Sequence, residues 1–171
     1  ILFYKELINK RFNIFIEKNK LFFTNKNIEI LNLIYENFNN ILDYNSTFPL
    51  SFVHGDFKSP NIFYKNNSEP IMLDWQYIHL NKPISDIIFL LVESIKFDKK
   101  KINLVLDYYF ILSKTSYDIF FRELKMSLCI FPFFVMVWFN SEKTEKLLDK
   151  TFPIKFMKNL LEYYNYFLDY K

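Results

Sequence analysis

The chain has 171 residues, of which 51% are hydrophobic and 24% charged, and its formal net charge is +3 at pH 7. These values are typical of one globular domain and exclude a disordered segment, a collagen and a coiled coil. The single cysteine excludes a disulfide scaffold, and so small a positive charge does not favour nucleic acid as a partner.

The first 49 residues have mostly helical patterns. Residues 1–23 fit both a strand and a helix, because part of the segment alternates in polarity and part has helical spacing. Residues 27–45 carry apolar side chains at helical spacing, and Asn27 is the expected N-cap. We therefore expect a helical lead-in over residues 1–49.

Short apolar runs follow, separated by turn residues. Three runs of strand length occupy residues 50–53, 62–64 and 71–73. Between the last two runs lies the polar segment 65–70, which has the length and composition of a hairpin turn. This pattern predicts a small β cluster over residues 50–80.

The helical period returns after Pro83 and continues to the end of the sequence. The apolar run from Met126 to Phe139 is shorter than the roughly 20 residues of a membrane span, so it predicts a buried helix. Cys129 within it is the expected inert thiol of a cytoplasmic protein. The expected helices cover residues 84–95, 102–112 and 116–139, with a short one near Ser141 and a last one from Pro153.

One glycine stands at a notable place. Average usage of about 7% would give about 12 glycines in this length, but the sequence contains Gly55 alone, between His54 and Asp56. This position is therefore expected to need a positive φ or a close approach of another chain segment.

Oxygen-bearing side chains gather in the same region. A loop carries Asp56 and Asn61, and the expected hairpin returns Asp74 to the same end of the strands. Such oxygen ligands suit Mg²⁺, which binds one or two carboxylates together with substrate phosphates. A carboxylate beside them can accept a proton from a hydroxyl group.

These residues form two motifs that resemble those of kinases. His54-Gly55-Asp56, followed five residues later by Asn61, resembles a kinase catalytic loop, and Asp74-Trp75-Gln76 stands where the metal-binding Asp-Phe-Gly motif belongs. Gly55 stands in place of the loop arginine of protein kinases, and Gln76 stands in place of the final glycine of Asp-Phe-Gly. Both replacements resemble the branch of kinases that act on small molecules. That branch holds the aminoglycoside phosphotransferases, choline kinases and ecdysteroid-kinase-like proteins, and the resemblance covers about residues 27–95.

The resemblance implies a fold, cofactors and roles. The implied fold is mainly α with a small β-hairpin cluster (α+β), the C-terminal lobe of a protein-kinase-like fold. Asp56 would orient the acceptor hydroxyl and take its proton, and Lys58 would lie near the γ-phosphate of ATP. Asn61 and Asp74 would hold Mg²⁺ on the nucleotide phosphates, and Asp86 would brace the loop.

Plainer interpretations stay open for several of these residues. Asp56 and Asn61 also fit an ordinary loop, and Lys58 fits an exposed lysine of a Lys-rich chain. Asp86 fits an acidic residue favoured in a first helical turn. His54 suits packing and hydrogen bonding better than base catalysis. His79 has no settled role. An acidic pocket among the later helices would suit an amine substrate, and the candidates for such a pocket are Glu93, Asp107 and Glu123, which the sequence does not rank.

The nucleotide-binding lobe of such a kinase is not visible in the sequence. A single glycine excludes a Gly-rich loop, and no strand-borne lysine motif precedes residue 27. We therefore expect a fragment that lacks the N-lobe and has little or no activity alone. Its expected parts are the lead-in 1–49, the catalytic loop and hairpin 50–80, and a helical substrate-side subdomain 81–171.

The sequence supports one main function and two alternatives. The main hypothesis is an ATP- and Mg²⁺-dependent kinase that phosphorylates a hydroxyl of a small molecule. The first alternative is a non-catalytic, kinase-like remnant or interaction domain. The second is a protein kinase, against which stand Gly55, Gln76 and the interval Trp75–Pro83, which is too short for a long activation segment.

Overall fold

The computed structural model describes residues 2–47, 49–66, 68–139 and 152–168. These residues form two compact units. The first unit combines residues 1–44 with 129–171, and the second comprises residues 45–128.

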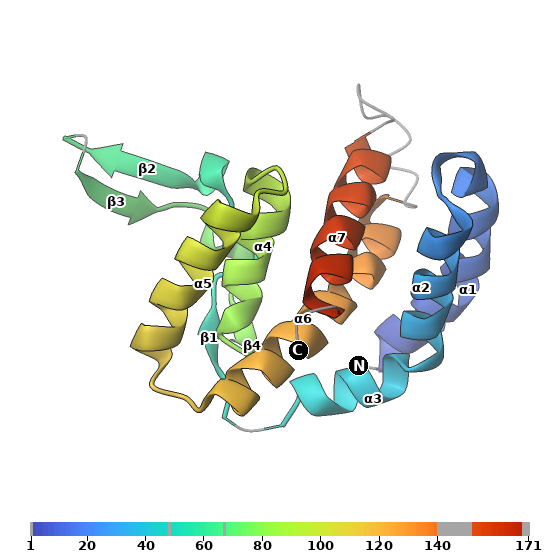
Figure 1. Cartoon of the computed structure of the whole chain (residues 1–171), viewed down its shortest axis with the longest axis horizontal. Coiled ribbons are helices and arrows are strands. Elements are labelled where there is room, and N and C mark those ends of the chain that lie inside the picture. Colours follow the sequence, from blue (N-terminus) through green and yellow to red (C-terminus); the bar gives the residue numbers. More distant parts are fainter. Residues whose placement is uncertain (1, 48, 67, 140–151, 169–171) are drawn as a thin grey trace. The chain divides into compact units, whose positions relative to one another are not determined.

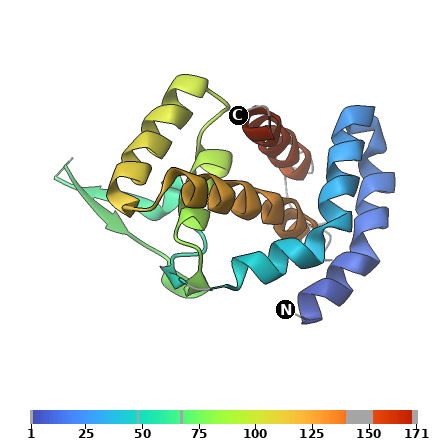
Figure 2. The same cartoon turned by 60° about the horizontal axis from the view of Figure 1, so that its bottom comes forward.

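The first unit is helical. Residues 2–19, which the sequence left ambiguous, form helix α1, which lies antiparallel beside α2 (Asn25–Glu36) (Figure 1, Figure 2). Aromatic rings join the helices: Phe12 stacks on Tyr35 with ring centroids 4.1 Å apart, and Phe38 lies 4.2 Å from Phe133. The helices are α1 (Leu2–Asn19), α2 (Asn25–Glu36), α3 (Phe38–Asn45) and α7 (Phe152–Leu168), with a 3-10 turn, η1 (Lys20–Phe22), after α1.

The helix expected over residues 27–45 is instead two helices, and Asn27 is not its N-cap. The hydroxyl of Thr24 accepts a hydrogen bond from the Asn27 amide at 3.2 Å, and the Asn27 side chain accepts one from the Thr24 amide at 3.2 Å. This reciprocal pair is a capping box, so Thr24 caps α2 and Asn27 occupies its third position. The chain then leaves the helical conformation at Asn37, which separates α2 from α3.

The second unit contains the β cluster. Strand β1 (Ser51–Val53) pairs antiparallel with β4 (His79–Asn81), so that Val53 faces His79. Strand β2 (Ile62–Lys65) pairs antiparallel with β3 (Glu69–Met72) to form a hairpin that projects away from the helices of this unit (Figure 1). The three strands expected from the sequence are confirmed, whereas β4 was not expected.

Helices complete the second unit. Helix α4 (Ile84–Ser94) follows β4 directly, α5 (Lys99–Ser113) is capped by Asp98, and α6 (Tyr117–Phe139) begins here and ends in the first unit. These three helices are those expected from the periodicity, while the helix expected near Ser141 lies outside the described residues. Their shared apolar core includes Ile84, Ile88, Leu91, Ile102, Leu106 and Leu124.

The apolar run near the end of α6 is buried at most of the positions whose side chains are described, and Met126 at its start is half-buried. Leu128, Cys129, Ile130, Phe131 and Phe133 all belong to the core. Within the described residues, no helix combines the length and the apolar character needed to cross a membrane. The interpretation of this run as a buried helix is thus confirmed for these five positions.

Candidate active site

The loop that follows β1 depends on Gly55. Its φ of +78° lies in the left-handed region, and a Cβ at this position would collide with the carbonyl oxygen of Tyr77. The same Cβ would stand 3.0 Å from Nδ1 of His79, a residue that carried no motif. Both reasons expected for a glycine, a positive φ and a close approach, are therefore present.

Asp86 binds the beginning of this loop. Its Oδ2 accepts a hydrogen bond from the His54 amide at 2.7 Å, and its Oδ1 accepts one from the Gly55 amide at 2.9 Å. Asp86 lies in the first turn of α4, so one carboxylate fixes two consecutive backbone amides to the start of a helix. The structure thus gives Asp86 a bracing contact in addition to its place at the helix N-terminus.

We expect Asp86→Asn to loosen the loop. An asparagine has one oxygen, so one of the two amides would face an NH2 group instead of an acceptor. The loss of one charge-assisted hydrogen bond is expected to lower the free energy of unfolding by about 1.5–3 kcal/mol. Urea unfolding measures this change, with the exposed Asp107→Asn of α5 as control. Equal stability of the two variants would contradict the bracing role.

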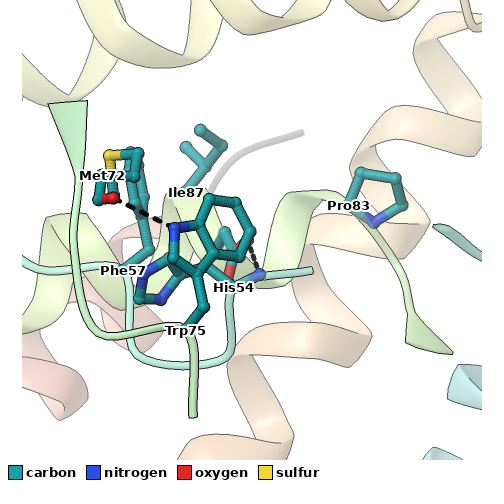
Figure 3. Close-up of a pocket in the computed structure, with 7 residues that line it drawn as sticks. His54, Phe57, Met72, Trp75, Pro83 and Ile87 are labelled. Carbon is teal, nitrogen blue, oxygen red and sulfur yellow. Dashed lines mark hydrogen bonds between the residues drawn. The ribbon is translucent and has the colours of Figure 1, made fainter. Parts of the chain in front are cut away.

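His54 connects the loop to the end of the hairpin. Its buried ring accepts a hydrogen bond at Nδ1 from the Asp56 amide at 3.3 Å, so the ring proton is assigned to Nε2, which donates to the Leu73 carbonyl at 2.8 Å. Trp75 packs on the same ring with centroids 4.7 Å apart (Figure 3). His54 therefore has the packing and hydrogen-bonding contacts expected from the sequence.

The structure brings together Asp56, Lys58 and Asn61. Oδ1 of Asp56 lies 3.0 Å from Nζ of Lys58, and its Oδ2 accepts a hydrogen bond from Nδ2 of Asn61 at 3.0 Å. The same Asn61 nitrogen donates to the Asp56 carbonyl oxygen at 2.9 Å. Asp56 is 8% exposed, so its carboxylate is held between a cation and an amide with little access to water.

Asp74 lies at the end of the hairpin, beyond β3. Its backbone has φ +62°, its side chain is exposed, and Gln76 donates to its Oδ2 at 3.3 Å. The preceding residue, Leu73, donates its amide to the Asn61 carbonyl at 2.9 Å and accepts from His54. Two backbone contacts therefore tie the segment leading to Asp74 to the loop that carries Asp56.

The described residues contain no cluster of three or more His, Cys, Asp or Glu side chains that could enclose a metal ion. The oxygen donors expected from the sequence are fewer: the carboxylate of Asp74, at the end of the hairpin, and the carbonyl oxygen of the Asn61 amide, in the loop. A Mg²⁺ site typically has few ligands from the protein, and water molecules and substrate phosphates supply the other ligands. The residues present therefore fit Mg²⁺ better than a metal held by protein ligands alone.

A cavity of about 240 Å³ adjoins the loop (Figure 3). The indole nitrogen of Trp75, on its wall, donates to the Met72 carbonyl at 3.0 Å. This bond and the contact with His54 fix the ring across the end of the hairpin. The residues that line the cavity are His54, Phe57, Met72, Trp75, Pro83, Asp86 and Ile87.

The C-terminal end of α4 reaches the other side of the loop. The Ser94 hydroxyl accepts a hydrogen bond from the Ser59 amide at 2.7 Å. Burial raises the pKa of the neighbouring Glu93, while Lys58 lowers it and Asp56 raises it further. Glu93 therefore interacts electrostatically with two residues of the loop.

Replacing Glu93 is expected to change the dependence of stability on pH. Because its pKa is raised in the folded state, folding binds a proton, and stability falls as the pH rises from 4.5 through the raised pKa. Glu93→Gln removes this contribution, so the variant gains stability relative to the unaltered protein between pH 4 and pH 7. Thermal unfolding across this range measures the gain, with Glu69→Gln as control. Parallel profiles would contradict the raised pKa.

The other two candidates have different surroundings. Asp107 is exposed on α5, whereas Glu123 is buried and forms an ion pair with Lys82 at 3.2 Å. Burial raises the pKa of Tyr109 to about 12, and the charges of Glu123 and Asp86 add to the rise. Sequence reasoning missed Lys82 and Ser94 because neither stands in a motif and both act on residues more than 30 positions away.

The mainly helical fold with a small β cluster agrees with the kinase-like class that the resemblance implied. The chain matches the ecdysteroid kinase-like family over residues 1–116, and it belongs to that family. No curated protein and no solved structure matches the chain.

Proposed function

We propose that this protein is an ATP- and Mg²⁺-dependent phosphotransferase that transfers the γ-phosphoryl group to a hydroxyl of a small molecule. The observation that carries the proposal is the Asp56 carboxylate, which is held by Lys58 on one oxygen and by Asn61 on the other. Membership of a kinase-like family supports the same class of reaction. Catalysis of this type consists of positioning and electrostatic stabilisation.

Asp56 is the proposed proton acceptor. In the reaction, the acceptor oxygen forms a bond to the γ-phosphorus and loses its proton to the Asp56 carboxylate, while the bond from the γ-phosphorus to the bridging oxygen breaks and ADP leaves. Lys58, whose ammonium group lies 3.0 Å from Asp56, supplies positive charge for the γ-phosphate. Its place beside the carboxylate supports both the catalytic and the nucleotide-binding role proposed for it.

Asn61 and Asp74 are the proposed ligands of Mg²⁺ and, through it, of the nucleotide phosphates. The Asn61 nitrogen is engaged by Asp56, so the amide oxygen is the atom that Asn61 can offer to a cation. When bound, Mg²⁺ would neutralise charge that develops on the phosphate oxygens. The hydrogen bond from Gln76 orients the Asp74 carboxylate, which supports its use as a ligand.

The proposed division of the chain follows the sequence. Residues 1–49 form a helical lead-in, 50–80 the catalytic loop and metal-binding hairpin, and 81–171 the substrate-side helices, all within one domain. The 171 residues contain a single glycine, and no strand-borne lysine motif precedes residue 27, so the Gly-rich loop and strand lysine of a nucleotide-binding lobe would come from outside them. The cytoplasmic location expected from the sequence stays a prediction.

A transfer assay with the complete natural protein tests this function. ADP formation is measured with Mg·ATP and a panel of hydroxyl compounds, which includes sterols, amino alcohols and aminoglycosides. We expect ADP formation that depends on one class of acceptor and on Mg²⁺, with matching phosphate on the acceptor. If no acceptor stimulates turnover and Mg·ATP does not stabilise the protein against heat, the non-catalytic alternative replaces this proposal.

A further inference from the structure

Lys82 is a buried lysine in a position that no motif explains. It lies between β4 and α4, its side chain is 2% exposed, and its Nζ stands 3.2 Å from Oε1 of Glu123 in α6. The same Nζ donates to the carbonyl oxygen of Pro49 at 3.3 Å. Lysine is almost never fully buried unless it is paired, because its ammonium group loses its hydration. The contacts of Lys82 must therefore account for its burial.

Lys82 and Asp86 hold the two ends of one strand. Pro49 precedes β1, and Lys82 binds its carbonyl oxygen. His54 and Gly55 follow β1, and Asp86 binds their amides. The positive side chain thus meets a backbone acceptor before the strand, and the negative side chain meets two backbone donors after it. Lys82 and Asp86 are four residues apart, at the beginning of α4.

Strand β1 needs such support because it is short. It has three residues and pairs with three residues of β4, which end directly before Lys82. A two-stranded ribbon of this size is marginally stable by itself. The position of the loop after β1, and of Asp56 within it, therefore depends on what fixes the ends of the strand.

We infer that Lys82 is a positioning residue for the loop that carries Asp56. It acts through Pro49 and β1, and Glu123 orients the buried ammonium group through their ion pair. The inference rests on the proposed function only for its effect on catalysis. An ion pair that merely stabilises the contact between α4 and α6 would have no specific effect on the loop.

Two variants separate positioning from general stability. Lys82→Met leaves Glu123 as a buried carboxylate without its cation and is expected to fold poorly. Lys82→Met combined with Glu123→Gln removes both charges, so the penalty of the isolated carboxylate disappears, while the Pro49 carbonyl still lacks its donor. Lys101→Met, at an exposed position of α5, is the matched control.

The first measurement is amide hydrogen exchange by NMR, which needs no nucleotide. In the double variant we expect the His54 and Gly55 amides to exchange at least about tenfold faster relative to the core amides of Ile102 and Leu106. The control should leave this ratio unchanged. If the loop and core amides of the double variant change in step, Lys82 contributes only to global stability and the inference is overturned.

The second measurement is kinetic. A displaced Asp56 should lower kcat by about tenfold or more and leave the KM for ATP nearly unchanged, because a small displacement affects the reacting geometry more than nucleotide binding. An unchanged kcat would overturn the positioning role in an active protein. If the unaltered protein transfers no phosphate but its loop amides respond as expected, the proposed function fails while the positioning by Lys82 stands.

Discussion

Asp56→Asn is expected to lower the kcat of phosphoryl transfer by about 10²–10⁴-fold, the usual contribution of a general base. The amide cannot accept the proton of the acceptor hydroxyl, and it carries no charge to hold Lys58. It retains the shape of the carboxylate, and its oxygen can still accept the hydrogen bond from Asn61. The fold should therefore persist, and the loss should appear in turnover, measured as ADP formation with Mg·ATP.

The matched control is Asp118→Asn, an exposed residue in the first turn of α6. This variant loses the same charge elsewhere in the chain and should keep full turnover. Circular dichroism and thermal unfolding of Asp56→Asn establish that its fold is retained. Undiminished turnover of a folded Asp56→Asn protein would remove Asp56 from the reaction.

Gly55→Ala is expected to have the largest effect on stability. An alanine must adopt the left-handed conformation, which costs about 1–2 kcal/mol, and its Cβ collides with the Tyr77 carbonyl oxygen. Relief of that collision requires a shift of the backbone before β4, at a further cost of about 1–3 kcal/mol. We expect the free energy of unfolding, measured in urea, to fall by about 2–5 kcal/mol.

Asn66→Ala separates the two causes of this loss. Asn66 lies in the exposed turn of the β2–β3 hairpin and has φ +53°, so its replacement tests the left-handed conformation without the collision at Tyr77. Because asparagine already carries a Cβ and tolerates this conformation, we expect a loss smaller than the ~1–2 kcal/mol of a glycine-to-alanine change. Equal losses at Gly55 and Asn66 would show that the contact with Tyr77 has no energetic consequence.

Local signals were sufficient to predict that Asp56 and Asn61 share one loop and that a hairpin follows it. Asp56 and Asn61 belong to one loop whose spacing is set by a few residues, and the hairpin turn indicated where Asp74 returns. The glycine at position 55 was conspicuous because the chain uses no other. For these residues, short-range spacing and residue type carry the geometry.

Long-range contacts could not be predicted in the same way. Lys82 binds Pro49 across 33 residues, and Ser94 binds Ser59 across 35, and nothing in the local sequence marks either pair. Strand β4 was missed because three residues give too little alternation, and its pairing with β1 depends on tertiary structure. The N-cap at Thr24 was missed because Asn27 is also a good capping residue, and only the backbone geometry distinguishes them.

The measurement that tests the central claim most directly is the binding of ATP to the complete natural protein by calorimetry, with and without Mg²⁺. We predict that Mg²⁺ strengthens ATP binding and that Asp74→Asn removes most of this increase, whereas Asp118→Asn retains it. Equal affinity for ATP with and without Mg²⁺, or an Asp74→Asn variant that keeps the full increase, would contradict the assignment of the loop and hairpin as a phosphoryl-transfer site.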